Sequence, residues 1–176
     1  MAKYLYETAE WDFKLIDDIY NECKTISDEE LGLDLYPNQF EIITYEQMND
    51  AMSSIGMPVF YQHWSFGKKF IQQEQSYKKH GHLPYELVLN SSPCINYLME
   101  NNSATLQTLV IAHAAFGHNN FFKTNYMFKQ WTDAESIIDY LVFAKKYIQQ
   151  CEERYGSEAV EYIIDSCHFL QRHCIN

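Results

Sequence analysis

Apolar residues recur at three- and four-residue spacing along most of the chain, which predicts a mainly helical fold. The segment 104–116 is apolar at almost every position, so we expect this helix to be surrounded by protein at the centre of the fold. An amphipathic helix is expected at 5–24, where Trp11, Leu15 and Ile19 lie between acidic residues. Two long amphipathic segments, 133–155 and 158–172, are expected to flank the central helix.

Two short segments have the β-branched and aromatic character of strands, residues 40–44 and 85–90. In the second segment, Tyr85, Leu87 and Leu89 are expected on one face, opposite Glu86. We expect the two segments to pair in a small sheet of two or three strands. The predicted fold class is therefore α+β: mainly α with a short β-sheet, a compact helical domain around a buried central helix at about 104–116.

Capping patterns place several helix boundaries. Thr44-Tyr-Glu-Gln47 forms a capping box, and Trp131-Thr-Asp-Ala-Glu135 contains a second one that should open the longest helix. Ser92-Pro93 has the order of an N-cap followed by proline at N1, which predicts a short helix reaching about Glu100. A further helix is expected from about Lys68 to Lys79. Helices and caps alternate without a linker or repeat, so residues 1–176 are expected to form one domain.

Composition and charge narrow the classes of function. With 176 residues, 47% of them hydrophobic, the chain can bury a substantial core. A net charge of -11 disfavours binding to nucleic acid or anionic lipid, and no apolar run reaches the length of a membrane span. The N-terminus lacks the apolar stretch of a signal peptide. The cysteines are odd in number and form no CxxC, which indicates reduced thiols in a cytoplasmic protein. They are Cys23, Cys94, Cys151, Cys167 and Cys174.

His113 and His118 are the strongest candidates for chemistry. Zinc-binding helices of the HExxH type place two histidines at i and i+4, whereas these two lie at i and i+5, about 140° apart on a continuous α-helix. The imidazoles could converge if the helix ends at Gly117, because glycine redirects the chain at low cost. The alternative is a structural pair, with His113 buried and hydrogen-bonded and His118 exposed at a helix end.

Carboxylates elsewhere could complete such a site. Asp165 and His168 have the i, i+3 relation of metal-binding carboxylate–histidine pairs, within a polar stripe that could equally be a solvated helix face. Glu86 stands on the polar side of a strand and, if buried, needs a histidine or a metal ion as partner. Glu153 belongs to the face opposite the apolar stripe of its helix, and would approach His168 only in a tight hairpin.

The aromatic segment 59–69 is a candidate binding loop. It contains His63-Trp64-Ser65-Phe66-Gly67-Lys68, and two lysines at a helix start oppose the helix dipole. We therefore predict a binding role for His63, Trp64, Ser65 and Lys68, against the alternative of an aromatic loop packed on the core. No P-loop or Ser-His-Asp signature is present in the sequence, so no nucleotide cofactor is predicted.

These residues together resemble the SpoVR (stage V sporulation protein R) family. The strings that carry the resemblance are LYPNQFEII at 35–43, SIGMP at 54–58, HWSFGK at 63–68, YELVLNSSPC at 85–94, AHAAFGHNNFFK at 112–123, WTDAESIIDY at 131–140 and CEERYG at 151–156. The resemblance implies a longer cytoplasmic bacterial protein of which this chain is the N-terminal region. It also implies a part in forming the spore cortex, a peptidoglycan layer, although the family occurs in bacteria that do not sporulate. It implies no particular reaction.

Three hypotheses follow. The first is a metal-dependent, hydrolase-like or regulatory centre with His113 and His118 as ligands, His168 or Asp165 as a third, and Glu86 or Glu153 as a carboxylate ligand or general base. Zinc is the expected ion, with iron or manganese as alternatives. The second is a non-enzymatic adaptor that binds a protein partner through loop 59–69. The third is a metal-free peptidoglycan-precursor enzyme with Glu86 as general base beside Lys68.

Overall fold

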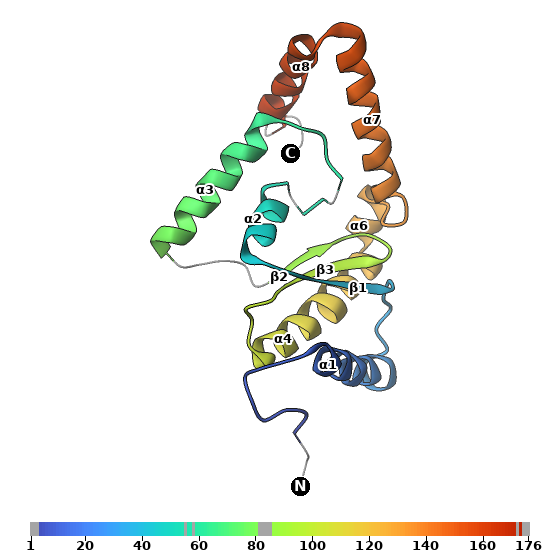
Figure 1. The fold of residues 1–176 in the computed structure, drawn as a ribbon. Helices are drawn as coiled ribbons and strands as arrows, with labels where there is room; N and C mark the ends of the chain where they lie inside the picture. The colour runs from blue at the N-terminus through green and yellow to red at the C-terminus, as the bar shows by residue number, and fades with distance from the viewer. Residues whose placement is uncertain (1–3, 55, 58, 81–85, 172, 174–176) are drawn as a thin grey trace.

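The fold is mainly helical with one small sheet, as the sequence predicts. The computed structural model describes residues 4–54, 56–57, 59–80, 86–171 and 173. The helices there, named α or, for the π-helical segments, η, are α1 (Phe13–Ile26), η1 (Ser27–Leu31), α2 (Tyr45–Ser53), α3 (Trp64–His80), α4 (Ala104–Ile111), η2 (Ala112–His118), α5 (Asn119–Thr124), α6 (Tyr126–Trp131), α7 (Ile137–Tyr155) and α8 (Ser157–Leu170). The strands are β1 (Asn38–Ile43), β2 (Glu86–Leu89) and β3 (Cys94–Met99). The sheet lies between α1 and α4 on one side and α2 and α3 on the other (Figure 1).

The sheet has the order β1-β3-β2, so the two strands predicted from sequence do not pair with each other. β3 lies between them, parallel to β1 and antiparallel to β2. This central strand occupies the segment for which Ser92-Pro93 predicted a helix to about Glu100, and that prediction is wrong. The run Cys94–Met99 is short and apolar, a pattern that fits a buried strand as well as a helix. Its fully buried residues Cys94, Asn96 and Leu98 alternate along the strand, and Met99 at its end is buried as well.

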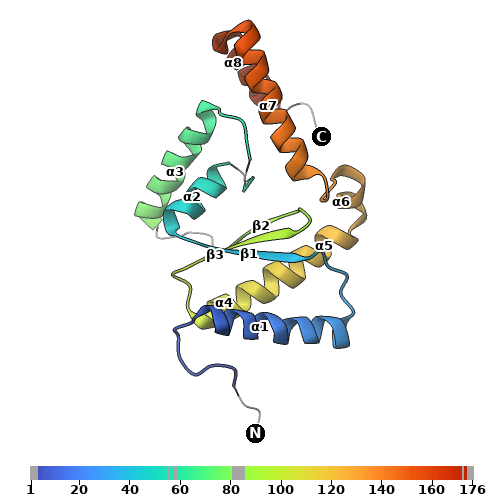
Figure 2. The same cartoon turned by 45° about the vertical axis from the view of Figure 1, so that its right-hand side comes forward.

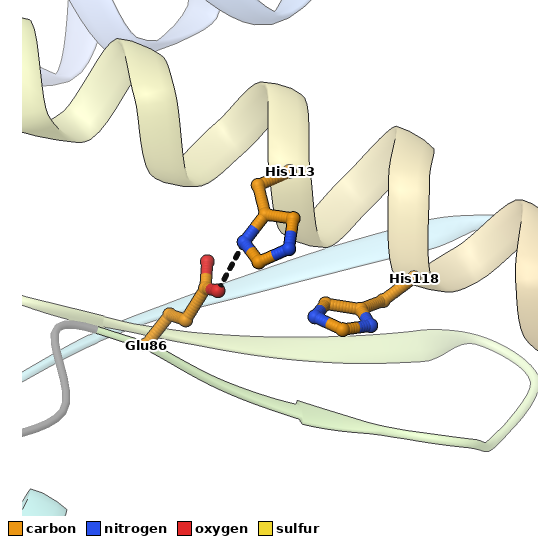
Figure 3. A group of neighbouring side chains, drawn as sticks. All are labelled: Glu86, His113 and His118. Carbon is orange, nitrogen blue, oxygen red and sulfur yellow. Dashed lines mark ion pairs between the residues drawn. The ribbon is translucent and has the colours of Figure 1, made fainter.

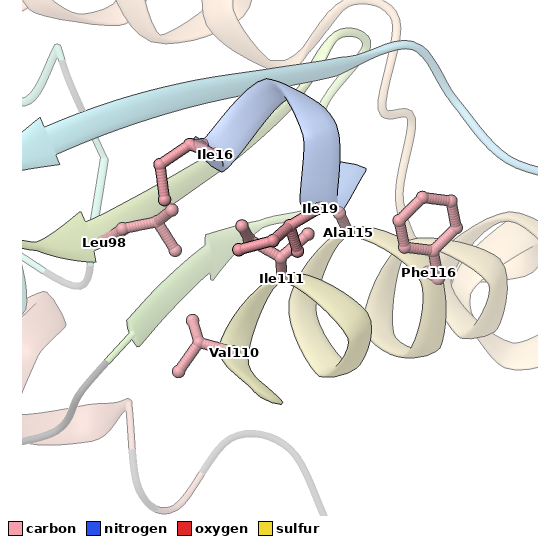
Figure 4. Close-up of a cluster of buried hydrophobic side chains, with 7 residues drawn as sticks. All are labelled: Ile16, Ile19, Leu98, Val110, Ile111, Ala115 and Phe116. Atoms are coloured by element: carbon pink, nitrogen blue, oxygen red, sulfur yellow. The ribbon is translucent and has the colours of Figure 1, made fainter. Parts of the chain in front are cut away.

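The core is formed where α1 and the central helix pack against the sheet. Ile16 and Ile19 of α1 meet Ile111 of α4 and Leu98 of β3 (Figure 4). The remaining members of this cluster are Val110, Ala115 and Phe116. Helix α1 begins at Phe13, well inside the predicted range, because Asp12 accepts a hydrogen bond from the amide of Leu15 and caps the helix.

From the sequence, we expected the two histidines to converge only if the central helix ends at Gly117. The helix does not end there. It continues from Ala104 to Thr124 as α4, η2 and α5, and Gly117 is not among the described glycines with positive φ. Its environment is also more open than expected. Val110 and Ile111 are buried against α1 and the sheet, but Leu109 on the other side is 65% exposed.

Helices α7 and α8 form a hairpin that rises away from the sheet, so they do not flank the central helix as expected (Figure 2). No described residue of either helix is fully buried. Helix α7 begins at Ile137 and not at the predicted capping box, because Asp133 holds the amide of Glu135 and the hydroxyl of Ser136 in a preceding turn. Among the described residues, no helix is long and apolar enough to cross a bilayer.

Candidate metal centre

His113 and His118 face the same side of the helix because the segment that carries them is π-helical. Their ring centroids are 4.4 Å apart, with the planes inclined by 47°. In a π-helix the hydrogen bonds run from i to i+5, so residues five positions apart lie above one another. The convergence that we expected from a bend at Gly117 is therefore achieved by a change in helix pitch. Single π-helical turns of this kind are frequent at functional sites.

The amide side chains of half-buried Asn38 and buried Asn119 fix the helix around this segment. Asn38 Nδ2 donates to the carbonyl oxygen of Ala115 at 3.0 Å. Asn119, at the end of the π-helical segment, binds both backbone groups of Tyr36 at 2.8 Å and donates to Asn38 Oδ1 at 2.9 Å. These contacts join the central helix to the segment before β1 and to its first residue. We predicted no role for Tyr36, Asn38 or Asn119 from the sequence. No feature of the neighbouring sequence shows that the Asn119 side chain bonds to a residue 81 positions away.

Glu86 comes to the two histidines from the first position of β2 (Figure 3). Its Oε1 atom lies 2.6 Å from Nδ1 of His113. One ligand atom from each of Glu86, His113 and His118 lies within 4.8 Å of the others. The three residues thus form a group with two imidazoles and one carboxylate, contributed by the sheet and the central helix.

The carboxylate of Glu86 is only partly satisfied by protein. Its side chain is 18% exposed, whereas that of His113 is 58% exposed. Its second oxygen, Oε2, is buried and has no hydrogen-bond partner among the described residues. A buried carboxylate oxygen without a partner is costly, and a bound cation or water would relieve that cost. The group therefore has one side open to solvent and an oxygen that favours a cation.

Asp165 and His168, which we expected as further ligands, lie elsewhere. Both belong to α8 and contact the start of α3, next to His63 and Trp64. Glu153 is exposed on α7 and belongs to neither group. Lys68 lines the cavity between α3 and α8, so the pairing of Glu86 with Lys68 in our third hypothesis is not observed.

The α3–α8 cluster is a connected set of polar contacts. Asp165 Oδ1 accepts hydrogen bonds from Trp64 Nε1 at 2.6 Å and from His63 Nε2 at 2.9 Å. The hydrogen bond from Trp64 is the main cause that lowers the pKa of Asp165, with His63 adding to it. The rings of His63 and His168 stack at 4.1 Å with a 4° inclination, and Tyr61 OH lies 2.6 Å from Nε2 of His168. Burial, followed by the nearby His63 and Lys69, lowers the pKa of His168.

Comparison with known proteins gives a consistent family assignment. A family model described as "SpoVR like protein" matches residues 10–176. The chain is 55% identical over 174 residues to "Uncharacterized protein YcgB" of Escherichia coli (strain K12). That match covers 98% of this chain and 34% of YcgB, so the chain spans about a third of the length of this relative. No solved structure matches.

Proposed function

The chain belongs to the SpoVR-like protein family, and we propose that it holds a divalent metal ion at Glu86, His113 and His118. The observation that carries the proposal is the mutual approach of the three ligand atoms within 4.8 Å, from two elements that are distant in sequence. Zinc–nitrogen and zinc–oxygen bonds are about 2.0–2.2 Å long, so two ligand atoms on one ion lie at most about 4.4 Å apart. Small side-chain rotations would bring all three into that range.

Glu86, His113 and His118 are a suitable set of ligands for a divalent metal ion. Two histidines and one glutamate leave at least one position free, which is the composition of catalytic zinc sites and also of two-histidine, one-carboxylate iron sites. The unpartnered oxygen Oε2 of Glu86 would gain a ligand or a hydrogen-bonded water. We take zinc as the first expectation, with iron or manganese as alternatives.

A competing arrangement is a metal-free ion pair between Glu86 and protonated His113, whose atoms are 2.6 Å apart. The two arrangements differ in their dependence on pH. Metal binding requires neutral imidazoles and releases any proton that they carry, so affinity for the ion should rise with pH. The ion pair needs that proton and weakens as pH rises. In addition, the ion pair gives no role to His118, whose ring lies 4.4 Å from that of His113.

The chemistry that we infer is hydrolytic. A divalent ion with a free position lowers the pKa of bound water and polarises a carbonyl or phosphoryl oxygen. The protein would contribute orientation: β2 supplies Glu86 and the π-helical segment supplies both histidines on rigid elements. A cytoplasmic setting and a role in spore-cortex formation are extensions of this proposal that rest on the family resemblance.

Metal content tests the proposal directly. The protein is purified, loaded with zinc, iron or manganese, desalted, and analysed by inductively coupled plasma mass spectrometry. We expect about one equivalent of one metal, with binding lost in His118→Ala and strongly reduced in Glu86→Gln. His173→Ala is the matched control, because this exposed histidine lies beyond the end of α8 and is not part of the group around Glu86. Circular dichroism verifies that each variant is folded. Failure of all three metals to bind stoichiometrically, or full retention by His118→Ala, would refute the proposal.

The adaptor hypothesis keeps one supporting observation, although the prediction of a loop over 59–69 is wrong from Trp64 onward, where α3 begins. Trp64 is 55% exposed, as expected of an interface anchor, although its indole nitrogen is held by Asp165. In that case Trp64→Ala would abolish capture of a protein partner while His113→Ala would affect only folding. Complementation of a deletion strain by a folded His118→Ala protein would favour the adaptor over the metal centre.

A further inference from the structure

A second candidate centre lies between the start of α3 and the end of α8, remote in the fold from the group around Glu86 (Figure 1). A cavity of about 940 Å³ is lined by residues of both segments there. Its polar lining includes His63, Ser65, Lys68, Asp165 and His168. Cavities with a few converging polar groups are where ligands usually bind.

Three of these side chains form a hydrogen-bonded relay. Ser65 Oγ lies 2.7 Å from Nδ1 of His63, and Nε2 of the same imidazole lies 2.9 Å from Oδ1 of Asp165. The tautomer that satisfies both contacts carries its proton on Nε2, which donates to the carboxylate and leaves Nδ1 to accept from the serine hydroxyl. A serine, an imidazole base and a carboxylate that orients the base are recognised as a nucleophilic set by geometry and not by order in the sequence.

The surroundings suit an imidazole that gains a proton during a reaction. The side chain of His63 is 1% exposed, so solvent does not compete for its nitrogens. The carboxylate of Asp165 is held in place by a second donor, Trp64 Nε1. The stacked ring of His168 has a lowered pKa, which keeps it neutral and removes a source of repulsion.

Charge at the cavity indicates the class of substrate. Lys68 and Lys69 both line it, on the first turns of α3. Their ammonium groups lie 5.9 Å from the ring of Trp64 and 5.7 Å from the ring of Phe66, respectively. Two cations beside the serine would attract a negatively charged group on the substrate.

We propose that Ser65 is a nucleophile, activated by His63 and with Asp165 as a positioning residue, for hydrolysis of a carboxylic ester that carries a negative charge. The serine oxygen bonds to the carbonyl carbon as its proton moves to Nδ1 of His63. The bond from that carbon to the alcohol oxygen then breaks, and the alcohol leaves with the proton. Water, deprotonated by the same imidazole, releases the acid and restores the serine. The balance is ester plus water to acid plus alcohol.

Active-site labelling tests the proposal. The whole chain is treated with a fluorophosphonate probe at neutral pH, and the adduct is measured by intact-mass spectrometry and peptide mapping. We expect one adduct, on Ser65, that is absent in Ser65→Ala and at least tenfold slower to form in His63→Gln. Asp165→Asn should slow labelling and shift its pH profile, as expected for a group that acts through the imidazole.

Ser166 provides the matched control. It lines the same cavity, but its hydroxyl donates to the carbonyl oxygen of Tyr162 at 2.8 Å and bonds to no imidazole within the described part of the chain. Ser166→Ala should therefore label like the parent chain. Labelling should also survive a chelator, which separates this centre from the proposed metal site.

Turnover tests the substrate class. The singly charged 4-nitrophenyl ester of succinic acid should be hydrolysed faster than neutral 4-nitrophenyl butyrate, and the preference should fall in the double variant Lys68→Gln/Lys69→Gln. Equal rates for both esters would refute the charge assignment. The absence of a Ser65 adduct in a chain with native circular dichroism would overturn the nucleophile itself, as would labelling that is unchanged in folded His63→Gln.

Discussion

Substituting Gly117 by alanine tests the continuity of the central helix, on which the candidate metal centre depends. A Cβ atom at this position would meet His113 Cδ2 at 3.8 Å and the carbonyl oxygen of Ala112 at 3.9 Å, both ordinary contact distances. Because no positive φ is required and no neighbour must move, the substitution should only reduce the conformational freedom of the unfolded chain. We expect Gly117→Ala to stabilise the protein by roughly 0.5–1 kcal/mol.

Gly56→Ala supplies the contrast. Gly56 has φ of 75°, and a Cβ atom there would lie 2.6 Å from Leu89 Cδ2 and 2.9 Å from Leu87 Cδ2. The left-handed backbone costs a residue with a side chain about 1–2 kcal/mol, and overpacking adds about 1–3 kcal/mol. We therefore expect this variant to be destabilised by at least about 2 kcal/mol.

Urea denaturation followed by circular dichroism measures both changes, and thermal melting provides a second readout. For a chain of this size, 1 kcal/mol corresponds to a shift in Tm of about 2–4 °C. If Gly117→Ala instead lowered the free energy of unfolding by more than about 1 kcal/mol, the chain would turn at Gly117 in a left-handed conformation. In that case a π-helical segment could not explain why His113 and His118 converge. Zinc affinity should be unchanged in Gly117→Ala, because the added methyl group only touches the edge of His113.

Three further predictions concern stability, protonation and thiol reactivity. Asn119→Leu should lower the free energy of unfolding by about 1–3 kcal/mol in urea denaturation, because it leaves the partly buried backbone groups of Tyr36 without their partner. An unchanged denaturation midpoint would contradict the amide network. His168 should titrate below pH 6.5 in NMR, since its pKa is lowered mainly by burial. The unfolded chain then binds more protons than the folded chain just below pH 6.5, so stability should fall as pH drops through that window; a His168 pKa above 6.5 would reverse the sign. Burial raises the pKa of Cys94 to about 12, so this thiol should resist Ellman's reagent at pH 8 in the folded chain while exposed Cys167 reacts; rapid modification of Cys94 would show that it is accessible.

Much of the helical framework is predictable because its signals are local. The capping box at Thr44 is present in the structure, with Gln47 reaching back to the Thr44 amide at 2.9 Å. The strand predicted at 40–44 corresponds closely to β1, Asn38–Ile43. These features depend on residues within a few positions of each other, so spacing and residue type are sufficient to find them.

The central strand was missed because its identity depends on neighbours and not on its own residues. Six residues from Cys94 to Met99 are too few for periodicity to separate a buried strand from a helix, and Ser92-Pro93 favoured the helix. What makes this segment a strand is the presence of β1 on one side and β2 on the other. That pairing requires contacts over more than 50 positions in the sequence for β1.

The candidate metal centre was predicted in its residues but not in its geometry. Glu86, His113 and His118 were all proposed from sequence, and they are neighbours in the structure. The i, i+5 spacing was read with α-helical geometry, which required a break at Gly117. The π-helical pitch is accompanied by tertiary hydrogen bonds from Asn38 and Asn119, which spacing within the helix does not reveal. Likewise, Asp165 was grouped with these histidines although it meets His63, 102 positions away.

The π-helical segment makes the number of residues between the two histidines matter in one direction only. Removing one residue from this interval would return the histidines to i, i+4, about 40° apart on an α-helix, so the pair could still converge. Asn119 follows His118 directly, so the same deletion would also leave it directed toward Tyr36 and Asn38. Adding one residue would instead turn both His118 and Asn119 by roughly 100° relative to His113. The interval should therefore tolerate a deletion far better than an insertion.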